Sequence, residues 1–99
     1  MEIVWSKNAV SRIEDIAAYI AKDSPSASQK WKRKIYEEVQ RVIKFPKIGR
    51  IVPEANRDEV REIFHGIYRI IYLIESKRIS ILTVRHGKQL LKHDEIIKK

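Results

Sequence analysis

Residues 60–88 read VREIFHGIYRIIYLIESKRISILTVRHGK, and most of the predicted sheet lies within them. Three runs within it are rich in Ile, Val, Tyr and Phe, which suit a pleated, half-buried surface. Two short connections join the runs, at His65-Gly66 and at residues 75–78. Glycine supplies the positive φ that a two-residue hairpin turn requires. The stretch therefore predicts three consecutive antiparallel strands.

Cations interrupt the apolar pattern of these strands, at Arg61, Arg69, Arg85, His86 and Lys88. A strand arginine among isoleucines needs a partner, because an unpaired buried charge is costly. Either an internal carboxylate or an external molecule must supply that partner. For Arg69 the internal candidates are Glu62 and Glu54, and pairing with either would make it a scaffold residue.

Two amphipathic helices are expected ahead of the strands. Ser6 is a candidate N-cap, and apolar residues then recur at helical spacing over residues 7–22. Ser24-Pro25 begins a second helix that reaches about Lys44, because proline suits a first helical turn. The short connection predicts an antiparallel helical hairpin.

The expected fold is α+β, with this N-terminal helical hairpin packed on one face of a small antiparallel β-sheet. Residues 2–5 form an outer strand, so the element order is βααβββ, with an optional short helix within residues 88–98. The proline- and asparagine-containing residues 51–59 are expected to form an ordered loop. A chain of 99 residues is expected to fold as one domain, residues 1–99.

The charge balance favours a polyanionic partner. The chain has 21 Lys and Arg against 13 Asp and Glu, and residues 25–50 hold eight cations against two acids. No cysteine is present and the three histidines are scattered, so neither a metal site nor a cofactor is expected. No apolar run approaches the roughly 18 residues of a membrane span, and the N-terminus lacks a signal-peptide pattern. We expect a cytoplasmic protein with no membrane partner.

Four segments together resemble the RelE/ParE toxins of type II toxin–antitoxin systems. They are RIEDIAAYIAKDSPSAS, FPKIGRIVPE, VREIFHGIYRIIYLI and ISILTVRHGKQLL, and the resemblance runs from Trp5 to Leu91. It implies a toxin of a plasmid-stabilisation or growth-arrest module. It also implies a cognate acidic antitoxin that wraps and neutralises the toxin in a hetero-oligomer. RelE-like members cut mRNA on the ribosome, whereas ParE-like members poison DNA gyrase.

A RelE-like reading makes the chain a metal-independent endoribonuclease. Such cleavage needs a base, an acid and cations that stabilise the charge on the phosphate. Arg69 matches the central-strand arginine that these nucleases place on the phosphate, and His86 titrates near neutrality. The candidate catalytic set is Arg69, His86, Arg61 and Lys88.

The partner-binding candidates are Arg69, Arg85, Tyr68 and Tyr72. Structural roles compete with these functions. The sequence favours His86 slightly more as the end of a strand than as a catalytic group, and it favours both tyrosines as residues of the core or its rim. The second face of the sheet, opposite the helices, is expected to be covered by the antitoxin and to meet the target.

Two departures favour the ParE-like side. Residues 51–62 carry two arginines against four acids, where RelE-like nucleases concentrate cations, and nothing after Tyr72 is aromatic. Poisoning gyrase requires a binding surface rather than a complete catalytic set. A third hypothesis is a nucleic-acid-binding module that uses the basic face of the second helix. The sequence leaves open whether the chain is an enzyme.

Overall fold

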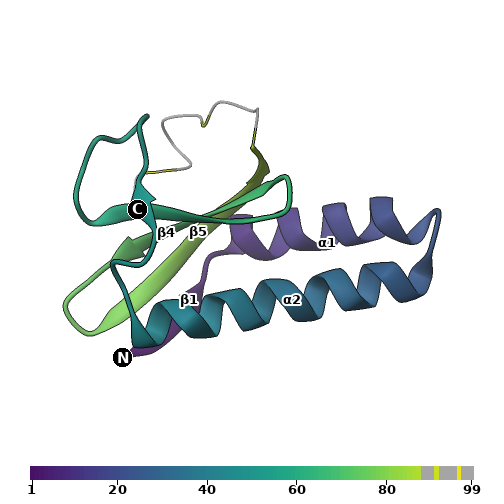
Figure 1. Cartoon of the computed structure of the whole chain (residues 1–99), viewed down its shortest axis with the longest axis horizontal. Helices are drawn as coiled ribbons and strands as arrows, with labels where there is room; N and C mark the ends of the chain where they lie inside the picture. Colours follow the sequence, from purple (N-terminus) through teal and green to yellow (C-terminus); the bar gives the residue numbers. More distant parts are fainter. Residues whose placement is uncertain (88–90, 92–95, 97–99) are drawn as a thin grey trace.

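The computed structural model describes residues 1–87, 91 and 96. A helical hairpin covers one face of a five-stranded sheet, and the hairpin's turn extends beyond the sheet (Figure 1). The α+β prediction is therefore confirmed. The elements in chain order are β1 (Glu2–Trp5), α1 (Lys7–Ala21), α2 (Pro25–Lys44), β2 (Arg50–Ile51), β3 (Val60–His65), β4 (Tyr68–Ile74) and β5 (Arg78–His86).

The helix boundaries follow from their caps, as predicted. The hydroxyl of Ser6 accepts a hydrogen bond from the Ala9 N–H at 3.0 Å, and the hydroxyl of Ser24 accepts one from the Ala27 N–H at 3.2 Å. Each cap satisfies a backbone donor that the first helical turn leaves unpaired. In the first turns of α2 the buried residue is Ser28, and its hydroxyl donates to the Ala17 carbonyl oxygen at 2.6 Å.

The sheet differs from the predicted one in three respects. Its order is β1-β5-β4-β3-β2, and β1 pairs parallel to β5, so the sheet is mixed rather than wholly antiparallel. The two-residue β2 lies where only a loop was expected, because Arg50 and Ile51 pair with Glu62 and Arg61 of β3. The first hairpin turn is one residue later than predicted: Gly66, with φ 58°, and Ile67 form it.

Alternate residues of β4 face the two sides of the sheet, as the period of two requires. Ile70 and Tyr72 join the helix-side core, whose helical members are Ala9, Ile13, Ile35, Val39 and Val42. Ile71 and Leu73 join a second cluster on the other face. The chain itself contributes to covering that second face, through Val52, Leu91 and Ile96. Part of the face that was expected to meet the antitoxin is therefore already covered by the chain itself, and contact of the antitoxin with this face stays a prediction. The optional C-terminal helix falls mainly outside the described residues.

Candidate functional site

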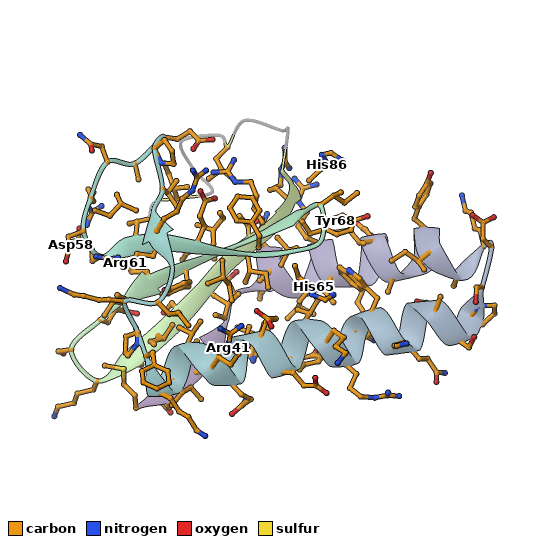
Figure 2. All side chains as sticks on the ribbon, in the orientation of Figure 1. Arg41, Asp58, Arg61, His65, Tyr68 and His86 are labelled. Atoms are coloured by element: carbon orange, nitrogen blue, oxygen red, sulfur yellow. The ribbon has the colours of Figure 1, made fainter. Side chains whose placement is uncertain are left out.

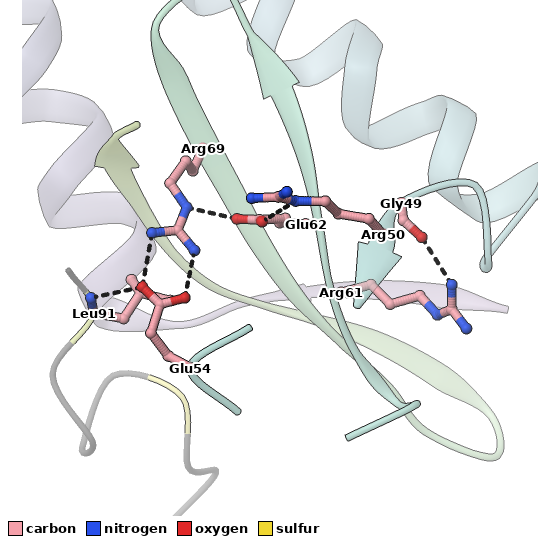
Figure 3. A network of polar contacts seen from close by, with 7 residues as sticks. All are labelled: Gly49, Arg50, Glu54, Arg61, Glu62, Arg69 and Leu91. Carbon is pink, nitrogen blue, oxygen red and sulfur yellow. Dashed lines mark hydrogen bonds and ion pairs between the residues drawn. The ribbon is translucent and has the colours of Figure 1, made fainter. Parts of the chain in front are cut away.

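A network of charged side chains lies on the second face of the sheet (Figure 3). The Arg69 Nε–H donates to one carboxylate oxygen of Glu62 at 2.5 Å, and the Arg50 Nε–H donates to the other at 2.6 Å. The Glu62 side chain is fully buried and that of Arg69 is 5% exposed. Glu62 therefore depends on the two guanidinium groups for its charge compensation.

Glu54, in the loop between β2 and β3, completes this network of charged side chains. It receives a bidentate pair from the two terminal nitrogens of Arg69, at 3.0 and 2.9 Å. The bonds from Arg69 hold the pKa of the Glu54 carboxyl at about 2, although burial opposes this shift. The same carboxylate accepts the Leu91 N–H at 3.2 Å. Glu54 thus joins the loop, the central strand and the backbone at Leu91.

Arg69 is held by the protein's own carboxylates. All three of its guanidinium nitrogens donate to Glu54 or Glu62, and these bonds raise its pKa further. The internal pairing considered for Arg69 is therefore present with both candidate acids at once. The proposed contacts of Arg69 with a phosphate or with a partner stay predictions.

Arg61 joins two loops at the other end of β3, near Asp58 (Figure 2). It donates to the Asp58 carboxylate at 2.7 Å and to the Gly49 carbonyl oxygen at 2.8 Å. Lys47 and then Arg61 lower the pKa of Asp58. Arg61 lies opposite Tyr72 in the register of β3 and β4, on the other face of the sheet from Arg69, so these two candidates do not form one catalytic cluster.

Tyr72 lies in the core and exposes no surface. Its hydroxyl donates to the Pro46 carbonyl oxygen at 2.6 Å and accepts the Gly49 N–H at 3.0 Å. Burial raises the pKa of Tyr72. The residue fastens the loop after α2 to the sheet, so its direct contact with a partner would require this loop to open.

Three other candidates meet in one pocket. Tyr68, Arg85 and His86 line a cavity of about 260 Å³. The rings of Tyr68 and His86 lie edge to face, with centroids 6.1 Å apart, and both occupy the same end of the sheet (Figure 2). The remaining walls are Arg12, Asp15, Ile16 and Val84.

The contribution of α1 to this pocket was not predicted. Arg12, Asp15 and Ile16 are spaced three and four residues apart, which places them on one helical face, and that spacing was the available signal. Arg12 and Asp15 from α1 join Arg85 and His86 from β5 in the lining, so cations and an acid meet around one polar cavity.

Metal binding gains no site among the described residues. Lys88 lies outside that part of the chain, and within it no group of three His, Asp or Glu side chains is placed to hold a metal ion. No helix there has the length and hydropathy that a membrane span requires. The candidate functional residues thus fall into three separate places: the charged network around Arg69, the loop contacts of Arg61, and the pocket beside His86.

Comparison with known proteins gives consistent matches over most of the chain. Residues 3–91 match the family model described as "ParE toxin of type II toxin-antitoxin system, parDE". The chain is 32% identical over 87 residues to "Putative toxin Y4kP" of Sinorhizobium fredii (strain NBRC 101917 / NGR234), which covers 88% of each chain. It also superposes with a TM-score of 0.73 on a chain of the structure titled "Chromosomal ParDE TA system from P. aeruginosa". That match covers 89% of this chain and 97% of the other at 20% identity, and it shows a shared fold.

Proposed function

The chain belongs to the ParE toxin family of type II toxin–antitoxin systems, and on that premise we propose that it arrests growth by binding and inhibiting DNA gyrase. A cognate antitoxin binds the toxin and neutralises it in a hetero-oligomer. The toxin acts in the cytoplasm, where gyrase is found, and its module serves plasmid stabilisation or growth arrest. This function requires a binding surface and no catalytic residue.

The observation that supports capture over catalysis is the environment of Arg69. A nuclease that uses this arginine needs its guanidinium directed at the scissile phosphate, where negative charge develops in the transition state. Here the guanidinium donates to Glu54 and Glu62, and its side chain is 5% exposed. A phosphate would have to displace two carboxylates, one of them with a pKa of about 2. The competition makes Arg69 a poor phosphate ligand.

The position of His86 argues in the same direction. Tyr68 and His86 pair across β4 and β5, whereas Arg69 pairs with Arg85 in the next register position. Successive strand residues point to opposite faces, so His86 and Arg69 direct their side chains to opposite sides of the sheet. A ribonuclease that used both groups on one phosphate would need them within hydrogen-bond reach of the same atoms.

The RelE-like ribonuclease remains the alternative, and the pocket beside His86 is the observation that favours it. Its lining brings the cations Arg12 and Arg85 together with His86 and Tyr68. In this alternative the phosphate is bound there, and His86→Ala should abolish toxicity while leaving the fold intact.

Two assays with the same purified protein test the proposal. Titrated into a gyrase supercoiling reaction, the toxin should inhibit, and prior addition of the antitoxin should restore supercoiling. Added to translating ribosomes, it should leave the mRNA intact. Ribosome-dependent mRNA cleavage with unimpaired supercoiling would reverse the assignment, and the His86→Ala variant would then identify the catalytic site.

A further inference from the structure

An apolar surface lies at the carboxyl end of α2, and no function described above uses it. Phe45 is 62% exposed and Ile48 is 42% exposed. With Lys44, Pro46 and Lys47 they line an open cavity of about 800 Å³. These five residues are called the α2-end patch. Large apolar side chains grouped on a surface mark an interaction site more often than isolated ones do.

The backbone below the α2-end patch is fixed from inside the protein. The buried Tyr72 hydroxyl bonds to both ends of the loop, at Pro46 and Gly49, and Arg61 donates to the Gly49 carbonyl oxygen. The Ile48 N–H donates to the Phe45 carbonyl oxygen at 2.9 Å. The outward direction of Phe45 and Ile48 is therefore built into the fold. A pre-ordered surface loses little conformational entropy when it binds.

The other exposed aromatic rings of the described chain each have a ring or a cation beside them, and Tyr36 packs edge to face with Trp5, with centroids 4.9 Å apart. Lys22 lies 6.0 Å from the Tyr19 ring centroid and Arg50 lies 5.3 Å from that of Phe64. No such cation–π contact is found for Phe45 within the described residues. Its ring is thus open to a partner.

Cations surround the α2-end patch, and three of the four pair with acids from other parts of the chain: Arg41 with Glu38, Lys47 with Asp58, and Arg50 with Glu62. Residues 41–51 contain Arg41, Lys44, Lys47 and Arg50 and no Asp or Glu. Lys44 forms no ion pair with a described residue, and the Lys47 side chain is 68% exposed although it reaches Asp58 at 3.1 Å. An apolar floor with a basic rim is complementary to a segment that carries apolar and acidic side chains together.

We propose that the α2-end patch docks an acidic, amphipathic segment of the cognate antitoxin. Apolar side chains of the segment fill the cavity against Phe45 and Ile48, and its carboxylates reach Lys44 and Lys47. The inference rests on the proposed function, because it takes the antitoxin as the partner. It adds where the toxin is bound, and by which chemistry.

The test measures the affinity of purified toxin variants for the purified cognate antitoxin by calorimetry. The Phe45→Ser/Ile48→Ser double variant should bind at least about thirtyfold more weakly, as expected when an aromatic anchor is lost. Tyr19→Ser is the matched control, because Tyr19 is 69% exposed near the far end of α1, and it should bind as the wild type does. Urea denaturation of all three proteins checks that the folds are equally stable.

A charge reversal at the α2-end patch tests the docking proposal independently. Lys44→Glu should weaken antitoxin binding and reduce its dependence on salt, whereas Lys30→Glu, the same change at an exposed site earlier on α2, should alter neither. Wild-type affinity in the folded double variant and in Lys44→Glu would overturn the docking proposal while leaving gyrase inhibition and neutralisation untouched. Loss of gyrase inhibition with unchanged antitoxin affinity would assign the patch to the target and also overturn the proposal. A wild-type toxin that the antitoxin neither binds nor neutralises would refute the proposed function itself.

Discussion

Replacement of Arg69 by alanine tests whether this residue serves the fold. Its guanidinium compensates Glu62, whose side chain is fully buried, and Glu54, whose side chain is 20% exposed. Breaking a buried ion pair by removing one partner costs about 3–5 kcal/mol. Arg50 still reaches Glu62, but its side chain is 60% exposed and leaves compensation incomplete. We therefore expect Arg69→Ala to lose about 3 kcal/mol, the lower end of that range.

Such a loss is large for a domain of this size. Small domains have total unfolding free energies of about 5–15 kcal/mol, and each kcal/mol lowers the melting temperature by roughly 4–8 °C. Urea denaturation should therefore show a much lower midpoint with an unchanged slope. His86→Ala is the control, because His86 is half-buried at the end of β5, and it should cost less than about 1 kcal/mol.

A second variant separates lost charge balance from lost packing. Arg69→Met combined with Glu54→Gln and Glu62→Gln removes the cation and both acids together, so no buried charge is left uncompensated. Neutral replacement of a whole buried ion network is often close to neutral in stability, and most of the lost stability should return. An Arg69→Ala protein with the wild-type urea midpoint would refute the scaffold reasoning, and a triple variant no more stable than Arg69→Ala would refute its electrostatic cause.

Three further predictions follow from other contacts. Tyr72→Phe removes the hydroxyl that bonds to the backbone of Gly49 and Pro46. It should lower the unfolding free energy by about 1–3 kcal/mol, measured by thermal denaturation. An unchanged unfolding free energy would count against the anchoring of this loop by Tyr72. Gly66→Ala should cost about 1–2 kcal/mol in stability because φ there is 58°, a left-handed conformation. No atom lies within 4 Å of the added methyl group, so the cost comes from the backbone alone. Gly66→Asn should therefore cost less, because asparagine tolerates this conformation better. The folded pKa of Glu54, about 2, lies below its ordinary 4.5, so its stabilising contribution is present above about pH 4.5 and is lost as the pH falls towards 2. The stability difference between the wild type and Glu54→Gln should shrink over that interval, and a constant difference would contradict the pairing.

Local sequence was sufficient for the helices and the long strands. Ser6, Ser24 and Pro25 mark the helix starts through contacts within one helical turn, and the alternation in residues 68–74 separates the two faces of β4. The two-residue β2 has no such pattern, since it exists through pairing with β3. The parallel placement of β1 beside β5 likewise depends on contacts between distant parts of the chain.

The residue types of the candidate site were predictable from the sequence, but not which of these residues contact one another. The sequence required a partner for Arg69 and named Glu54 and Glu62, yet only the fold shows that it pairs with both. The register of β4 and β5 then separates Arg69 from His86. The exposure of Phe45 was not predictable, because it depends on hydrogen bonds from the distant Tyr72.

Gyrase inhibition by the folded triple variant Arg69→Met/Glu54→Gln/Glu62→Gln tests directly whether the toxin acts by capture, with Arg69 serving the fold. If Arg69 serves the fold and the toxin acts by capture, this protein should inhibit supercoiling at the same concentration as the wild type and should still arrest growth. A triple variant that keeps its fold but no longer arrests growth, beside a wild type that cleaves mRNA on ribosomes, would contradict the account.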